Sequence, residues 1–156
     1  MISNKILRLL ALVTLILVLL AGTIQVPQEA IGQAATSVTN IQISFKLDPS
    51  ITRGMYMGER WVSPPTYTAV QDGKEITVEA SVQGLDAKGK PIDISPEWIP
   101  EDPKMVAVSP AKGRQVKITV RRTGQSGLKV AAQGFSRKLV VKATHLEGAI
   151  QVEISQ

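Results

Sequence analysis

The chain has 156 residues, with 18 lysines and arginines against 13 acidic residues, and a formal net charge of +5. It contains no cysteine, which excludes disulfides, thiol catalysis and cysteine-bound metals. A chain of this length is ordinary for one domain, and such a domain buries roughly two-thirds of its unfolded surface without needing a disulfide.

The N-terminal segment has the pattern of a secretory signal peptide. Lys5 and Arg8 precede or border a run of 18 uncharged residues, Leu9 to Val26, which we expect to form a signal helix outside the fold. An uncleaved membrane anchor is the alternative, because a run of this length can just span about 30 Å of hydrocarbon. Contact with a membrane is expected only in that case.

A cleavage site is predicted after Ala34, because Gly32 and Ala34 supply the small residues that a signal peptidase requires. Residues 1–34 are therefore interpreted as the signal peptide and residues 35–156 as the exported chain. Export predicts an extracellular, cell-surface or periplasmic location.

From Asn40 onward, apolar residues recur at every second position, which predicts strands with one buried face. Six such sets occur, at 41–47, 76–82, 116–120, 128–132, 139–143 and 150–154. Glycine-containing polar segments at 71–74, 86–91, 122–127 and 133–137 separate several of them and are typical of tight turns. We expect essentially no helix after residue 34. The pattern predicts an all-β antiparallel sandwich.

A recognisable order of segments runs from Glu75 to Ala143. The segments are "EITVEASVQG", "GKPIDISPEW", "DPKMVAVSP", "KITVRRTGQSGLKVAAQG" and "RKLVVKA". This order resembles the bacterial immunoglobulin-like domains of group 2, although "WIPEDP" stands where that family commonly has serines. The resemblance covers roughly residues 75–143 and implies an immunoglobulin-like β-sandwich. Because the chain extends beyond this module at both ends, we expect one enlarged domain over 35–156 with an N-terminal extension, 35–74. We expect strands 41–47 and 149–155 to be extra strands that pair with each other or flank the sandwich.

Trp98 is interpreted as a structural core residue. It falls on a segment predicted to be a central strand, and it resembles the core tryptophan of immunoglobulin-like sandwiches. We expect it to be buried against Val130 and Val78.

Acid–base and metal chemistry have few candidate residues. The only histidine is His145, which we expect to be solvated. Glu97, Glu101 and Asp102 are close in sequence, but their polar loop offers no burial to raise a carboxyl pKa and no spacing typical of a calcium loop. We predict a solvated or ion-paired loop, no metal, no cofactor and no enzymatic activity.

Positive charge is concentrated in residues 103–146, which contain ten lysines and arginines and no acid, whereas 72–102 contain eight acids and three bases. Alternation places several of these bases on outward positions. This candidate basic face consists of Lys117, Arg121, Lys129, Lys138 and Lys142. Such a face can attract a polyanionic polymer, although aromatic residues for nucleic-acid binding are missing and no nucleic acid is expected. The alternative is a soluble face whose charges pair across strands, for instance Glu79 with Lys117.

The segment "RGMYMGERWVSPP" (53–65) does not alternate, and its paired prolines favour an extended backbone that crosses between sheets or covers one end. The candidate interaction loop within it consists of Arg53, Met55, Tyr56, Met57, Arg60 and Trp61. These side chains can form a hydrophobic plug for the core, or a docking surface, because tyrosine, tryptophan, methionine and arginine are enriched at protein interfaces.

The expected function is that of an exported, non-catalytic module for protein interaction, adhesion or assembly at the cell surface or outside the cell. The adhesion and assembly roles are implied by the family resemblance, since fold alone does not specify a partner. The alternative is a basic module that binds polysaccharide or another polyanion of the cell envelope.

Overall fold

Eleven β-strands and no helix make up the part of the chain that the computed structural model describes, residues 37–47 and 60–156. The strands are β1 (Asn40–Lys46), β2 (Trp61–Val62), β3 (Thr66–Asp72), β4 (Ile76–Leu85), β5 (Pro91–Ile92), β6 (Glu97–Pro100), β7 (Val106–Ser109), β8 (Gln115–Val120), β9 (Gly124–Ala132), β10 (Phe135–Leu146) and β11 (Ala149–Ser155). Within these residues there is no helix of the length and apolarity that a membrane span requires. The signal helix and the 1–34 segment lie outside the described residues.

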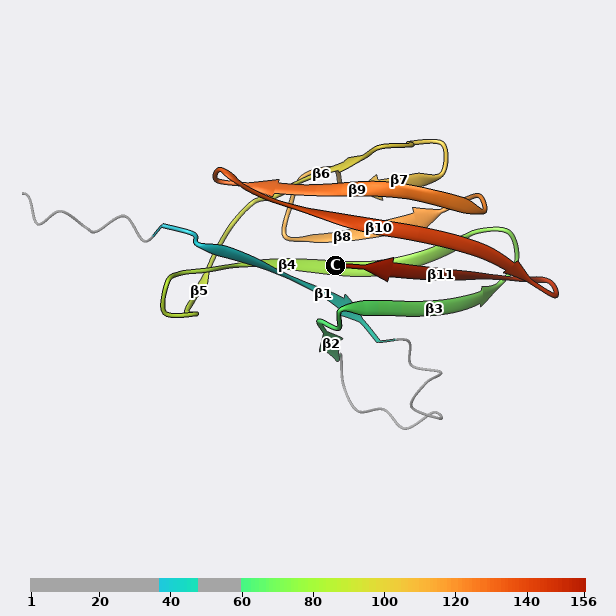
Figure 1. The fold of residues 1–156 in the computed structure, drawn as a ribbon, viewed down its shortest axis with the longest axis horizontal. Coiled ribbons are helices and arrows are strands. Elements are labelled where there is room, and N and C mark those ends of the chain that lie inside the picture. Colours follow the sequence, from blue (N-terminus) through green and yellow to red (C-terminus); the bar gives the residue numbers. More distant parts are fainter. Residues whose placement is uncertain (1–36, 48–59) are drawn as a thin grey trace, which may run out of the picture. The chain divides into compact units, whose positions relative to one another are not determined.

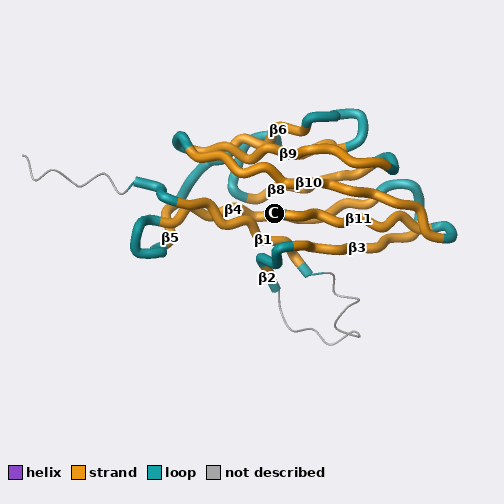
Figure 2. The backbone as a smooth tube through the Cα atoms, viewed as in Figure 1, coloured by secondary structure: helices purple, strands orange, loops and turns teal. Residues whose placement is uncertain are grey.

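The strands form two antiparallel sheets that pack face to face (Figures 1 and 2). Sheet A has the order β2-β1-β4-β8-β7, with β5 paired to one end of β4. Sheet B has the order β3-β11-β10-β9-β6. The prediction of an all-β antiparallel sandwich is confirmed.

Sequence alternation explains why these segments are strands. Along β4, every second side chain from Ile76 to Gly84 is buried while those between are partly or fully exposed, as expected for a sheet with one face on the core. Two-residue turns join β9 to β10 and β10 to β11. Both have two positive φ angles, at Gln133–Gly134 and Glu147–Gly148, which is the geometry that matches the twist of a hairpin.

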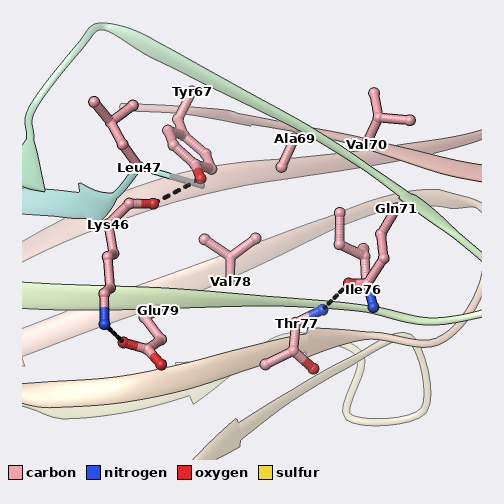
Figure 3. Close-up of a pocket in the computed structure, with 10 residues that line it drawn as sticks. All are labelled: Lys46, Leu47, Tyr67, Ala69, Val70, Gln71, Ile76, Thr77, Val78 and Glu79. Carbon is pink, nitrogen blue, oxygen red and sulfur yellow. Dashed lines mark hydrogen bonds and ion pairs between the residues drawn. The ribbon is translucent and has the colours of Figure 1, made fainter. Parts of the chain in front are cut away.

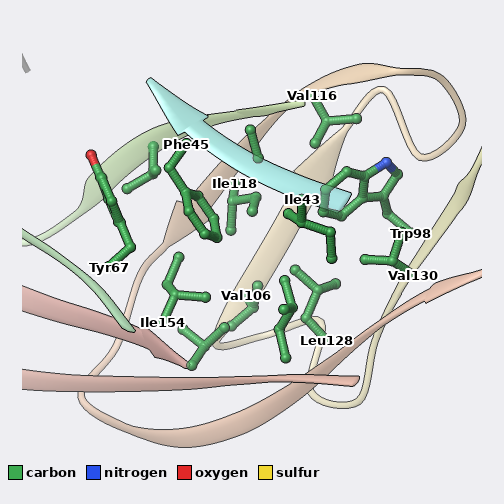
Figure 4. Close-up of a cluster of buried hydrophobic side chains, with 14 of the residues drawn as sticks. Ile43, Phe45, Tyr67, Trp98, Val106, Val116, Ile118, Leu128, Val130 and Ile154 are labelled. Atoms are coloured by element: carbon green, nitrogen blue, oxygen red, sulfur yellow. The ribbon is translucent and has the colours of Figure 1, made fainter. Parts of the chain in front are cut away.

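The core lies between the inner faces of the sheets (Figure 4). Phe45 of β1 and Tyr67 of β3 stack with ring centroids 4.7 Å apart, so they join the two sheets near one end of the cluster. Near the other end is Trp98, which is only 2 % exposed and lies opposite Val130 in the strand register. Its indole N–H donates to the carbonyl of Gly113 at 3.1 Å.

The positions of three strands differ from expectation. β1 pairs with β4 and β2, whereas β11 pairs with β10 and β3, so these two strands neither pair with each other nor flank the sandwich. Each is an interior strand of a different sheet and is paired on both sides. Trp98 is not on a central strand, because β6 is the edge strand of sheet B. Its burial comes from the opposite sheet and from the chain segment beside β6.

The turn expected at 122–127 is also shorter than predicted. β9 begins at Gly124, so Gln125–Gly127 belong to the strand and pair with β10. The two glycines that favoured a turn therefore have different roles. Gly124 has a positive φ of 133°, and Gly127 lies under the side chain of Glu101.

Candidate functional site

β3 is the edge strand of sheet B and pairs on one side with β11. It has seven residues, "TYTAVQD", and contains neither proline nor lysine, which commonly protect sheet edges from pairing with other chains. Val70, in the middle of this strand, is 51 % exposed. The edge therefore has seven residues, and its single charged residue, Asp72, lies at one end.

The hydrogen bonds beside β3 identify which of its backbone groups point away from β11. Gln156 N–H donates to Pro65 C=O, and Gly73 N–H donates to Gly148 C=O, so the odd-numbered residues between them face β11 in the alternating ladder. The N–H and C=O groups of the even-numbered residues therefore point to the free side. These residues are Thr66, Thr68, Val70 and Asp72.

The edge of β4 is also open beside β3. Pairing of β1 with β4 stops at Phe45 opposite Ala80, so among the described strands the first four residues of β4, 76–79, pair only with β8. At this point the Lys46 carbonyl accepts a hydrogen bond from the Tyr67 hydroxyl of the other sheet at 2.9 Å. The next amide, Leu47 N–H, donates to Arg60 C=O.

A cleft of about 320 Å³ lies between these two edges (Figure 3). Tyr67 and Val78 contribute to its apolar floor, and an ion pair between Lys46 and Glu79, 3.0 Å long, crosses one end. At the other end, the Gln71 side-chain oxygen lies 3.4 Å from the Thr77 backbone N–H, one of the β4 groups left without a strand partner. We call the β3 edge together with this cleft the open side of the sandwich.

The open side offers backbone donors and acceptors beside an apolar surface. Extended polypeptide is the ligand that matches both, since its backbone pairs with a sheet edge while alternate side chains enter the pocket. Arrangements for acid–base chemistry require a nucleophile and a base within hydrogen-bond reach, and the groups lining this cleft do not form one.

Most of the candidate interaction loop lies outside the described residues, namely Arg53, Met55, Tyr56 and Met57. Arg60 is exposed and Trp61 is half-buried, on β2 opposite Lys46. Trp61 lines a second cavity, of about 250 Å³, on the outer side of sheet A. The expected crossing between sheets is confirmed for its C-terminal part, because β2 belongs to sheet A and β3 to sheet B.

The candidate basic residues are all exposed, but they do not share one face. Lys117 is on β8 and Arg121 follows it, in sheet A, whereas Lys129, Lys138 and Lys142 are on β9 and β10, in sheet B. The outer faces of packed sheets point in opposite directions, so the basic charge is divided. Glu79 lies opposite Lys117 in the register, as expected, but its carboxylate pairs with Lys46.

The three clustered acids each pair with a different base. Glu97 lies 3.3 Å from Lys112, Glu101 2.6 Å from Lys138 and Asp102 3.1 Å from Arg122. The described residues contain no group of three or more histidines and acids arranged to hold a metal ion. His145 is exposed near the end of β10, with Nδ1 3.4 Å from the Ala149 carbonyl oxygen.

Glu101 folds back over β9. A side chain at Gly127 would overlap the Glu101 carboxyl group, so the absence of one makes room for this carboxylate. The hydrogen bond from Lys138 holds the pKa of Glu101 below its ordinary value, and the charge of Lys138 and a backbone hydrogen bond from Gly127 act in the same direction. Partial desolvation opposes them.

The sequence analysis missed β3 and therefore the open side. Its seven residues have only two apolar inward positions, Tyr67 and Ala69, and no long alternating set. A usable signal was present, because Thr, Tyr and Val favour strands and the segment lies between Pro65 and the predicted turn at 71–74.

Comparison of the chain with family models, with curated proteins and with solved structures found no match.

Proposed function

We propose that this chain is an exported, non-catalytic interaction module that binds protein at the cell surface or outside the cell, through the open side of its sandwich. The observation that carries the proposal is the seven-residue β3 edge, which is free of proline and lysine and borders an apolar cleft. Exposed edges of this kind pair readily with other polypeptides. Export rests on the N-terminal sequence pattern.

The finer assignment is to the bacterial immunoglobulin-like domains of group 2. It is supported by the antiparallel two-sheet sandwich and by a tryptophan in the core at Trp98. This assignment implies a role in adhesion or in assembly at the cell surface.

Photo-cross-linking in the host cell tests the proposal. A photoreactive side chain at Val70, on the β3 edge, should give a cross-linked protein product in the cell-envelope or extracellular fraction. The matched control is Gln42, which is exposed on the outer face of sheet A and should give none. A chain retained in the cytoplasm, or equal products from both positions, would contradict the proposal.

Salt dependence separates protein docking from polymer binding. Retention by an anionic envelope polymer should weaken steeply as salt rises, because counterion release drives it. Pairing at the β3 edge uses neutral backbone groups and should persist. The polyanion-binding alternative would be favoured if binding to the polymer is lost at high salt and the photoreactive side chain at Val70 gives no cross-linked protein.

A further inference from the structure

We infer that the protein partner of the β3 edge is a second copy of this chain, which pairs antiparallel with β3 about a two-fold axis at Ala69. This inference rests on the proposed function, because it takes β3 as the contact strand. It goes further by specifying the partner, the register and the residue on the axis.

The free backbone groups of β3 fix the register. They belong to Thr66, Thr68, Val70 and Asp72, since the odd-numbered residues face β11. With Ala69 on the axis, Thr66 lies opposite Asp72 of the second copy and Thr68 lies opposite Val70. All the outward N–H and C=O groups of both strands are then used, in about eight hydrogen bonds. A shift of the axis to Thr68 or Val70 leaves one end of each strand unpaired.

The side chains are compatible with this register. Ala69 forms the central pair, at a position without direct backbone hydrogen bonds where Cα atoms approach to about 4.5 Å, and a small side chain permits that approach. Val70 is 51 % exposed in the single chain and would lie beside the methyl group of Thr68 in the second copy. The two-fold axis repeats this contact, so the exposed Val70 of each copy is covered by Thr68 of the other.

The charge on β3 does not oppose pairing of two identical copies. Asp72 is the only charged residue of β3, and it lies at one end of the strand. In the antiparallel pair it faces Thr66, and the two Asp72 carboxylates are about 20 Å apart, well beyond the screening length at physiological salt. No like charges of β3 therefore face each other across the axis.

Disulfide trapping tests the register directly, because the native chain has no cysteine. Full-length Ala69→Cys protein, purified in mild detergent and oxidised with copper–phenanthroline, should form a covalent dimer, since the predicted Cα separation suits a disulfide. The matched control is Thr66→Cys on the same strand, whose two copies would be about 20 Å apart. We expect at least a tenfold higher dimer yield for Ala69→Cys. Equal yields, or no dimer, would overturn the inference.

A second variant tests the same contact without a cross-link. The Val70 N–H faces the free side, so Val70→Pro removes an intermolecular donor and leaves the β3–β11 ladder intact. By sedimentation equilibrium in the same detergent, we expect the dimer dissociation constant to rise at least tenfold with an unchanged melting curve. Val70→Thr keeps the N–H and should dimerise like the parent. A monomeric parent, or a Val70→Pro dimer as tight as the parent's, would refute the second copy as partner.

These outcomes separate the two proposals. If Val70 cross-links to a different protein while Ala69→Cys gives no dimer, the interaction module stands and the self-pairing is wrong. If no protein is cross-linked at Val70 and no dimer forms, both are wrong.

Discussion

The two edge strands of sheet B, β6 and β3, differ in whether another part of the described chain covers them. At β6, the backbone N–H of Trp98 donates to Ala111 C=O at 2.9 Å, and Glu97 forms a β-bridge with Lys112. A short segment of the chain therefore lies along this edge like an added strand. Pro100 closes the end of β6. At β3, the longer of the two strands, no such cover is found among the described residues.

Within the described residues, the chain covers the β6 edge of sheet B with a segment of its own and leaves the β3 edge uncovered. A covered edge gains stability from hydrogen bonds and burial within the chain, whereas an open edge leaves the same groups to water or to a partner. Mutations at β6 should therefore act on folding, and mutations on the free side of β3 should act on association.

The largest effect is expected at the covered edge. Trp98→Ala should lower the free energy of unfolding by about 3–5 kcal/mol, because it removes a side chain that is 2 % exposed and leaves a cavity between the sheets. Denaturant melts measure this change, and Trp98→Phe, which keeps much of the burial, should cost less. A loss below about 1 kcal/mol for the alanine variant would mean that β6 is not held as described.

Proline placed at adjacent residues of β3 should distinguish its two sides. Ala69 N–H faces β11, so Ala69→Pro should cost at least about 2 kcal/mol by leaving a strand carbonyl unpaired. Val70→Pro should cost less than about 1 kcal/mol, because its N–H has no partner within the ladder. Thermal melts at low protein concentration compare the two. Similar losses at both positions would show that the assignment of inward and outward groups is wrong.

The contact between Glu101 and Gly127 should cancel much of the usual stabilising effect of alanine. In the parent, Gly127→Ala should change stability little, since the new Cβ displaces the Glu101 carboxylate from Lys138 and the loss of this exposed ion pair offsets the gain in backbone entropy. In a Glu101→Ala background it should be stabilising by about 0.5–1 kcal/mol, because alanine loses less backbone entropy in a strand than glycine does. A double-mutant cycle by urea melts would refute the contact if Gly127→Ala had the same effect in both backgrounds.

The smallest effect concerns the pH dependence of the same carboxylate. The pKa of Glu101 is lower in the folded state than its ordinary value, so the unfolded state binds more protons between the two values. The stabilisation from Glu101 is therefore present above the unfolded pKa and is lost as pH falls through the folded pKa. The unfolding free energies of the parent and Glu101→Gln should differ at neutral pH and converge in acid. A difference that grows as pH falls would contradict this sign.

The sequence predicted the sandwich and six of its strands because long alternating sets, such as that from Ile76 to Val82, carry their burial pattern locally. It also predicted that the acids Glu97, Glu101 and Asp102 would be ion-paired or solvated. Sheet order was not predictable in the same way, since the place of β11 between β3 and β10 depends on pairing between distant residues.

The candidate site was less predictable than the fold. The cleft lies where β1 leaves β4 after Phe45 and where the Tyr67 hydroxyl, from the other sheet, donates to the Lys46 carbonyl. Neither event has a local sequence signal. The expected basic face is divided between the two sheets for a related reason. Alternation predicts whether a side chain points inward or outward, but it does not predict which sheet a strand joins.

The place of β11 also has a consequence for the order in which the chain can fold. Among the described strands, β3 is attached to sheet B only through β11, and β11 follows it by more than 70 residues. While the chain is being synthesised, β3 therefore has no sheet to join until residues 149–155 have emerged from the ribosome. Sheets that depend on such distant pairing form slowly. Sheet B therefore stays incomplete until β11 is available.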